Sequence, residues 1–259
     1  MALEPIDNFD EMKLGKAAVL TANWRKENVI KAFLFHKNDI ECLAQEEGVV
    51  GVRFYIGITT KENGEDAPDM IAVGVNDQNE DIINETSEAK SIDEFSGIYD
   101  FALPCPELCD PESILFKAIG NVNPIRTTSM MKTVQHSTEN ECFIKLGEIS
   151  EQEAVDRVSI WQCEMNKELI SIYFNIEDLD AVFNEFTIIN EDTNALRVYF
   201  GLEDGVHRVI LIGATNSVND YYSDIDTPEV YVNTAAPCTG NGEVSCAVNR
   251  ILYTTCTES

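Results

Sequence analysis

Residues 53–57 read Arg-Phe-Tyr-Ile-Gly, and residues 197–201 read Arg-Val-Tyr-Phe-Gly. The same order of segments continues downstream, because Ile-Ala-Val-Gly at 71–74 returns as Ile-Leu-Ile-Gly at 210–213. An internal repeat sets the architecture of a chain before any single motif does. We therefore expect two tandem copies of one small unit.

The flanking segments repeat as well. Residues 35–43 correspond to 174–182, and the only tryptophans, Trp24 and Trp161, stand at matching places upstream. We expect each indole to be a buried anchor of its unit. Each copy also closes on a Pro-Cys pair followed by a second cysteine, in one case Cys105 with Cys109 and in the other Cys238 with Cys246.

Each unit reads as helix, strand, helix, strand, strand. Apolar residues at helical spacing precede each tryptophan, and the repeated Arg-x-Tyr segments have the mixed pattern of half-buried strands. A turn rich in Gly and Asp then joins the last two strands as a hairpin. The predicted fold class is α+β, an antiparallel sheet with helices on one face in each unit, with an internal pseudo-twofold axis. The predicted boundaries are 1–112 for the first unit, 113–147 for a linker and 148–259 for the second unit.

Asp39 and Asp178 stand where the second helix of each unit begins. A carboxylate at this place can cap the helix and interacts favourably with its dipole. We interpret both as capping residues rather than as chemical groups.

The chain is strongly acidic. It has 18 Lys plus Arg against 46 Asp plus Glu, a formal net charge of −28 at pH 7. Nucleic acids and anionic lipids bind proteins through Lys and Arg, so the sequence excludes nucleic acid as a partner. The acidity is then a solubilising surface, a surface for a cationic partner or for divalent cations, or a trait of a high-salt habitat.

The expected location is the cytoplasm, without membrane insertion. Residues 1–7 lack the basic and apolar segments of a secretion signal, and no stretch reaches the ~18 apolar residues of a membrane span. In a reducing cytosol the eight cysteines stay thiols. Cys42, Cys142 and Cys163 lie in apolar or helical pattern and are expected to be buried small hydrophobic residues.

Catalytic motifs are missing from the sequence. It has no nucleophile elbow, no phosphate-binding loop, no dinucleotide fingerprint and no His-Glu-x-x-His. The three histidines, His36, His136 and His207, occupy non-equivalent positions, so a duplicated active site built on them is not expected.

Arg53 and Arg197 recur inside predicted strands of a chain that is poor in cations. One reading is a salt bridge to a nearby carboxylate. The other is a ligand-binding site that clamps an anion or carboxylate, which the planar guanidinium suits. Such a site would be formed by Arg53 with Tyr55 and by Arg197 with Tyr199.

The paired cysteines are the candidate metal ligands. Cys105, Cys109, Cys238 and Cys246, brought together by the two units, would hold a tetrahedral zinc ion. Their spacings, with three and seven residues between the members of a pair, are wider than in a zinc knuckle. Unligated thiols and a disulfide within each pair are the alternatives. No cofactor is otherwise expected.

Several stretches of the first unit resemble a group of short uncharacterised Bacteroidetes proteins. The matching stretches are the strand at 52–57, the strand at 71–76 and the closing Cys105-Pro106-Glu107-Leu108-Cys109. Those proteins carry a single unit with an Arg-x-Tyr-Phe-Gly strand, an Ile-Val-Gly-Val-Asn strand and a final Cys-Pro-Pro-x-Cys. The resemblance covers roughly residues 15–110, and the second copy departs from it in its cysteine spacing. It implies a bacterial protein made by duplicating a stand-alone unit, and it implies no activity.

Duplication, exposed sheet edges and missing catalytic motifs together favour a non-catalytic structural or protein-interaction protein, as a subunit or accessory of a larger bacterial assembly. The expected partner is another protein or a second copy of the chain. The alternatives are a module that binds a small ligand or metal through the Arg/Tyr strands or the cysteine pairs, and an enzyme of unrecognised type.

Overall fold

We describe the chain from a computed structural model. The structure describes residues 9–26, 28, 30–60, 64–83, 96–104, 113, 115, 147–164, 169–215, 220–221, 229–233 and 238–239. Within these residues every strand pair is antiparallel, and helices and sheets are both present, so the α+β class is confirmed. None of the helices described is long and apolar enough to cross a membrane.

The elements follow one another in the predicted order in both halves of the chain. The first half contains β1 (Phe9–Lys13), α1 (Leu14–Trp24), β2 (Ala32–His36), α2 (Lys37–Leu43), β3 (Gly51–Thr60), β4 (Asp66–Val75), β5 (Asp81–Ile82), β6 (Ile98–Tyr99) and β7 (Leu103–Pro104). The second half contains α3 (Glu151–Ser159), the π-helical turn η2 (Ile160–Glu164), β8 (Leu169–Asn175), α4 (Ile176–Ile189), β9 (Ala195–Glu203), β10 (Val206–Ala214), β11 (Asp220–Tyr221), β12 (Glu229–Asn233) and β13 (Cys238–Thr239).

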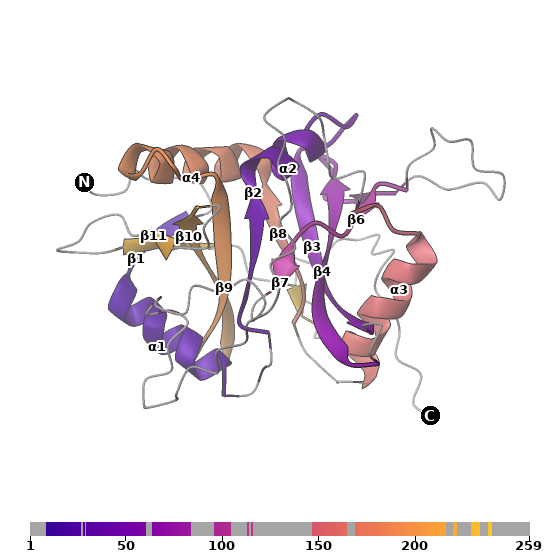
Figure 1. The fold of residues 1–259 in the computed structure, drawn as a ribbon, viewed down its shortest axis with the longest axis horizontal. Helices are drawn as coiled ribbons and strands as arrows, with labels where there is room; N and C mark the ends of the chain where they lie inside the picture. The colour runs from indigo at the N-terminus through magenta and orange to yellow at the C-terminus, as the bar shows by residue number, and fades with distance from the viewer. Residues whose placement is uncertain are drawn as a thin grey trace.

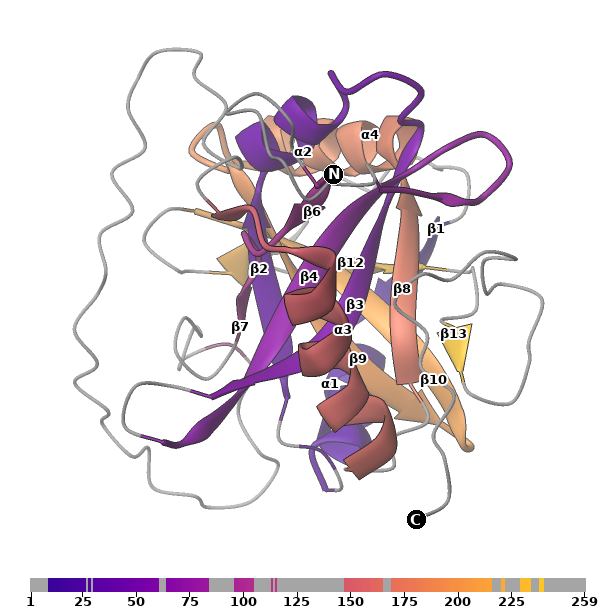
Figure 2. The same cartoon turned by 90° about the vertical axis from the view of Figure 1, so that its right-hand side faces the viewer.

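The strands form two sheets. Sheet A has the order β1-β12-β10-β9-β2-β7 with β11 beside β10, and sheet B has the order β13-β8-β3-β4-β5 with β6 beside β4. Helix α1 lies against sheet A and α3 lies against sheet B, while α2 and α4 run across one end of both sheets (Figure 1). Figure 2, viewed from the side of α3, shows this helix in front of β3 and β4. Each sheet therefore carries one helix on its outer face.

The two halves of the chain exchange strands. Residues Ala32–His36 of β2 lie opposite Ala195–Tyr199 of β9, and Gly51–Tyr55 of β3 lie opposite Ser171–Asn175 of β8. Each sheet is thus built from both halves, whereas two separate lobes at 1–112 and 148–259 would each keep their own sheet. The alternation of polar and apolar residues predicts which residues form strands and which face of each strand is buried. It does not predict which strand lies alongside, because a strand from the same half and a strand from the other half satisfy the pattern equally well.

The helices are exchanged in the same way, and the glycine of each Arg-x-Tyr-x-Gly segment permits it. A Cβ at Gly201 of β9 would lie 3.0 Å from the Cβ of Leu20 on α1, and one at Gly57 of β3 would lie 3.2 Å from the Cβ of Arg157 on α3. These glycines let a helix from the other half approach the sheet backbone closely.

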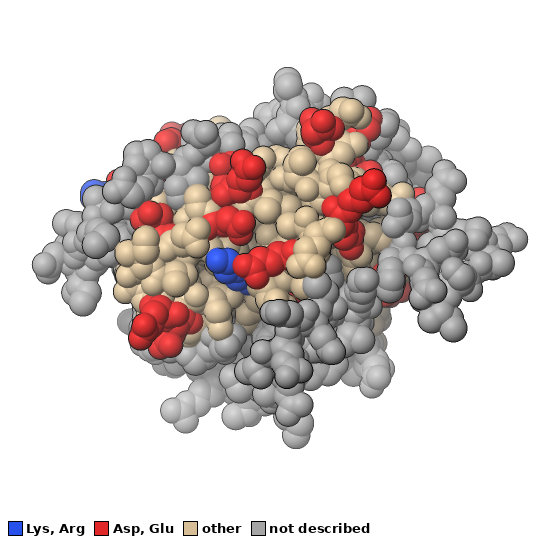
Figure 3. Space-filling view, turned by 90° about the horizontal axis from the view of Figure 1, so that it is seen from above, with Lys and Arg blue, Asp and Glu red and all other residues tan. Residues whose placement is uncertain are grey.

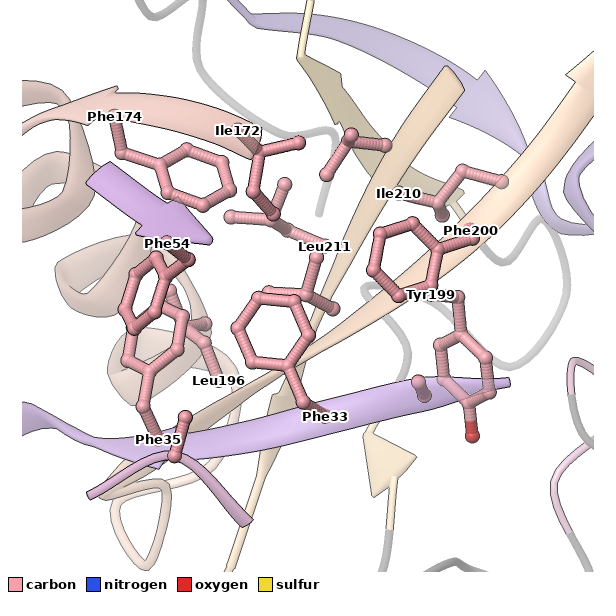
Figure 4. Packing of buried hydrophobic residues seen from close by; sticks show 14 of the residues in the cluster. Phe33, Phe35, Phe54, Ile172, Phe174, Leu196, Tyr199, Phe200, Ile210 and Leu211 are labelled. Atoms are coloured by element: carbon pink, nitrogen blue, oxygen red, sulfur yellow. The ribbon is translucent and has the colours of Figure 1, made fainter. Parts of the chain in front are cut away.

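The largest cluster of buried hydrophobic residues joins the two sheets (Figure 4), and a smaller one lies between sheet B and α3. Phe54 of β3 contacts Phe33 and Phe35 of β2 with ring centroids 5.1 and 5.2 Å apart, and it contacts Phe174 of β8 at 6.1 Å. Strands from both halves thus supply neighbouring rings. This largest cluster therefore draws on both halves of the chain.

The predicted tryptophan anchors are confirmed. Trp24 and Trp161 are both buried, and each indole nitrogen donates to a backbone carbonyl a few residues on. Trp24 Nε1 lies 2.6 Å from the oxygen of Ile30, and Trp161 Nε1 lies 2.7 Å from that of Leu169. Each indole therefore ties the end of its helix to the following strand.

The N-cap residues are His36 for α2 and Asn175 for α4, so the predicted caps at Asp39 and Asp178 are wrong by position. Both aspartates lie in the first helical turn, where the helix dipole favours them. The Asn175 side chain accepts the Glu177 amide at 2.8 Å, which is the capping bond of α4.

The start of the predicted linker 113–147 packs on the core. Ser113 and Leu115 are both buried, and the carbonyl of Leu115 accepts a hydrogen bond from Arg25 at the end of α1. These two residues therefore belong to the folded body.

Candidate functional site

Arg53 and Tyr55 meet Asp81 on the outer face of sheet B. Both alternate along β3 with core residues, so their side chains point away from the space between the sheets. Arg53 Nη1 donates to one carboxylate oxygen of Asp81, and the Tyr55 hydroxyl donates to the other. Arg53 Nη2 also donates to Asn79 Oδ1 at 2.6 Å. We call Arg53, Tyr55 and Asp81 the first Arg–Asp–Tyr cluster.

The second half builds the same arrangement on sheet A. Arg197 Nη1 donates to one oxygen of Asp220, and the Tyr199 hydroxyl donates to the other at 2.6 Å. The Ser113 hydroxyl also hydrogen-bonds to Tyr199. Arg197, Tyr199 and Asp220 form the second Arg–Asp–Tyr cluster.

Both clusters are sealed from solvent. The side chains of Arg53 and Arg197 are 1% and 0% exposed, and those of their aspartate partners are 0% exposed. Burial and the adjacent carboxylate raise the pKa of Tyr55 and of Tyr199 well above the ordinary value, so both phenols remain protonated donors. Burial also raises the pKa of Asp81, while Arg53 acts in the opposite direction.

The four predicted ligand-binding residues are therefore brought together in pairs, each pair around a buried carboxylate. Each carboxylate is already held by a guanidinium on one oxygen and by a phenol on the other. This is the salt-bridge reading of the two arginines. An anion would have to displace a buried aspartate to use either guanidinium.

Sequence reasoning missed Asp81 and Asp220 as the partners of the arginines. Each lies in the polar stretch just after the strand that ends in the repeated Ile-x-x-Gly segment. The signal was therefore their matching place in the two halves of the chain. It was obscured because each aspartate stands among several other acidic residues.

A further charged cluster fastens α3 to sheet B. Arg157 Nη1 donates to Asp69 of β4 and, at 2.8 Å, to Asp100, while Nη2 donates to Glu153 at 2.5 Å. Burial, and then the neighbouring Asp100, raise the pKa of Asp69 to about 6. The single guanidinium serves three carboxylates and holds the helix on the sheet.

The predicted zinc ligands fall largely outside the described residues. Cys105, Cys109 and Cys246 are not described, and Cys238 is described only by its backbone, which pairs with Ser171 of β8. Within the part of the chain that the structure describes, no group of three or more His, Cys, Asp or Glu is arranged to hold a metal ion.

Cys42 is buried, as predicted, whereas Cys163, also predicted to be buried, is half-buried, and neither is a thiol. Cys42 and Cys163 are both disulfide-bonded, and no cysteine among the described residues is free. The prediction of thiols rested on an assumed reducing compartment, because sequence alone does not show which cysteines are oxidised.

Helices α2 and α4 carry a group of acidic residues that reach the surface, of which Glu41 and Glu177 are exposed and the others are half-buried. Helix α4 carries Glu177, Asp178, Asp180 and Glu185 and has no Lys or Arg. Helix α2, which contacts α4, adds Glu41. Seen from above, the described part of this end of the molecule shows far more acidic than basic surface (Figure 3). We call Glu41, Glu177, Asp178, Asp180 and Glu185 the α2–α4 surface.

Lys37 is the one cation on these two helices. Its Nζ lies 3.8 Å from Glu41 and 6.0 Å from the centre of the Phe183 ring. One lysine balances only part of the charge of the α2–α4 surface. The carboxylates of the α2–α4 surface therefore outnumber the single lysine of these helices.

In comparisons with known proteins, no family model, no curated protein and no solved structure matched this chain.

Proposed function

We propose that this protein is a non-catalytic interaction protein, as a subunit or accessory of a larger bacterial assembly, and that it binds a cationic protein surface through the α2–α4 surface. The observation that supports this most is the charge of α4, with four carboxylates and no cation in one helix. Facing charges of opposite sign steer association and fix the orientation of partners.

The ionisable side chains inside the fold are bonded to one another, which agrees with a non-catalytic binding role. The buried arginines, tyrosines and aspartates of both Arg–Asp–Tyr clusters hydrogen-bond to one another, and Arg157 is bonded to the carboxylates around it. These groups hold elements together. We therefore assign the function to the surface of the molecule. A rigid body beneath that surface lowers the entropic cost of binding a partner.

We further propose that the two halves are duplicates related by a pseudo-twofold axis. Three pairs of matching details support this: the two Arg–Asp–Tyr clusters, the two indole bonds and the two glycines under a helix. Strand exchange between the halves has the form of a domain-swapped dimer joined into one chain.

The disulfides of Cys42 and Cys163 change the proposed location. Disulfides persist in oxidising compartments and are rare in the cytosol. We therefore place the protein outside the cytoplasm rather than inside it. Alkylation of the denatured protein before and after reduction tests the disulfides, because Cys42 and Cys163 should be modified only after reduction; modification of both without reduction contradicts them.

The proposed function is tested with a synthetic Lys-rich helical peptide as the probe, its binding followed by fluorescence anisotropy. Glu177→Lys with Glu185→Lys should weaken binding by about tenfold or more, which corresponds to about 1.4 kcal/mol. The matched control is Glu151→Lys with Asp156→Lys on α3, which changes the net charge equally at two exposed positions. Equal weakening in both variants would mean that only the overall charge attracts the peptide, and the proposed surface would be wrong.

A further inference from the structure

Helix α1 differs from every other helix described in its charge. Its sequence, Leu-Gly-Lys-Ala-Ala-Val-Leu-Thr-Ala-Asn-Trp, contains no acidic residue in a chain with 46 of them. Lys13 is its N-cap, and Lys16 lies in its first turn. Cations at a helix N-terminus oppose the dipole, so helix stability does not explain their presence.

These cations lie on an exposed surface with apolar residues between them. Lys13, Lys16 and Val19 follow one another at a spacing of three along α1, and residues three apart share a helix face. Lys16 is 54% exposed and Val19 is 48% exposed. On β10, Arg208 shares a carboxylate partner with Lys16, and the nearby Val206 is 47% exposed. We call Lys13, Lys16, Val19, Lys26, Val206 and Arg208 the α1 surface.

One carboxylate serves two of these cations. Glu203 of β9 lies 2.7 Å from Lys16 Nζ and 3.1 Å from Arg208 Nε. Hydrogen bonds from Lys16 and then Arg208 lower the pKa of Glu203, so it is ionised at neutral pH. Lys26 Nζ donates to the uncharged side chain of Asn23 at 2.9 Å, so Glu203 is the one carboxylate bonded to Lys16, Lys26 or Arg208 among the residues that the structure describes.

We propose that the α1 surface docks on the α2–α4 surface of a second copy of this chain. This rests on the proposed function of the α2–α4 surface and names its partner. Both surfaces also have exposed apolar residues. Ile188 of α4 is 63% exposed, and because it lies three helical turns from Glu177 it is on the same face of the helix. Exposed aliphatic residues beside facing charges of opposite sign are features of protein–protein interfaces.

The contact joins two different surfaces, so it is head-to-tail. In Figure 1, α1 lies on the outer side of sheet A, away from α2 and α4 at the end of the sheets, so one copy does not pair its own two surfaces. A docked pair keeps one unused surface of each kind. Association therefore continues to larger assemblies instead of stopping at a symmetric dimer.

Salt affects this contact in two opposing ways. Copies with a net charge of −28 repel each other at long range, while the facing charges attract at contact. At about 0.15 M salt the Debye length of about 8 Å screens the distant charges more than the facing ones, whereas about 1 M salt, with about 3 Å, screens both. We expect association at the first salt concentration and its loss at the second.

The test is sedimentation velocity of the full chain over a range of concentrations. The mean mass of the wild type should rise above 28.9 kDa with concentration at the lower salt concentration and return to it at the higher. Lys16→Glu with Lys26→Glu, and Glu177→Lys with Glu185→Lys, should each give a monomer. One variant makes the chain more acidic and the other less, so loss in both does not follow from net charge.

A mixture of the two variants gives the decisive result. Each retains the one surface that the other lacks, and the two reversed surfaces are themselves opposite in charge, so an equal mixture should associate although neither variant associates alone. A monomeric mixture, a wild type that is monomeric at every concentration, or association unchanged by both variants would each overturn the proposal. The peptide experiment above is independent, so self-docking can fail while the α2–α4 surface still binds a cationic partner. Unchanged circular dichroism and melting temperature show that the variants are folded.

Discussion

The two arginines that repeat in the sequence act as buried cross-links within the fold. Each guanidinium, each phenol and each carboxylate of the Arg–Asp–Tyr clusters is hydrogen-bonded to another member. The contribution of each of these side chains to the free energy of unfolding depends on whether its partners are present. Taking away one charge of a buried pair leaves the other unpaired in a medium that solvates it poorly, whereas replacing both is often tolerated.

Arg53→Met should therefore lower the free energy of unfolding by about 3–5 kcal/mol, because Asp81 keeps a buried charge without its partner. Tyr55→Phe should cost less, about 1.5–3 kcal/mol, since it removes one hydrogen bond to a charged acceptor. Urea denaturation of both variants measures the difference. The combined Arg53→Met and Asp81→Leu variant should recover part of the loss, and an Arg53→Met protein as stable as the wild type would contradict the cluster.

Asp39 should make the protein less stable as the pH rises. Burial raises the pKa of Asp39 from 3.8 to about 6, against a hydrogen bond from the His36 backbone that lowers it. The folded state then binds the proton more tightly than the unfolded state between these values. Stability from this group is fully present below about pH 4 and is lost as the pH rises through 6, up to about 3 kcal/mol.

Asp39→Asn removes the charge and keeps an acceptor for the His36 amide. Urea unfolding from pH 4 to pH 7 should show the wild type losing stability relative to this variant as the pH rises. Asp69→Asn is a useful comparison, because the pKa of Asp69 is also raised to about 6. Equal pH slopes in the wild type and in Asp39→Asn would contradict the assignment.

At the scale of elements, the sequence predicts what forms but not what pairs. The strands around 53–57 and 197–201, the helices before each tryptophan and the buried indoles are as expected, because period and burial are local properties. The pairing of β2 with β9 and of β8 with β3 is not local. The choice between an own and an exchanged strand depends on how the connecting segments cross the molecule, which alternation does not encode.

The glycines at 57 and 201 give a direct test of the exchanged helices. Gly201→Ala should destabilise the protein by about 1–3 kcal/mol, because its Cβ would lie 3.0 Å from that of Leu20 and the helix must shift. Gly57→Ala, with Arg157 at 3.2 Å, should behave alike. Gly15→Ala in α1 is the control, because nothing lies within 4 Å of the added carbon and it should stabilise the helix by about 0.5–1 kcal/mol. Similar melting temperatures for all three variants would mean that neither helix approaches its sheet as closely as described.

At the scale of the whole molecule, the exchange makes the halves interdependent. Sheet A needs β1 and β2 from the first half, and sheet B needs β8 from the second. The phenylalanine rings of the core likewise come from both halves. A half on its own would expose the edge of β3 or of β9 and one side of the core.

Neither residues 1–147 nor residues 148–259 should therefore fold as a monomer when expressed alone. Co-expression should give a one-to-one complex with a single cooperative unfolding transition, because each half supplies the strand that the other lacks. A half that refolds by itself is expected to do so as a homodimer, since an equivalent strand from a second copy can fill the same place. Size-exclusion chromatography with light scattering separates these outcomes. A stable, monomeric half with native near-ultraviolet circular dichroism would show that each unit completes its own sheet, and the exchanged pairing of β2 with β9 would then be wrong.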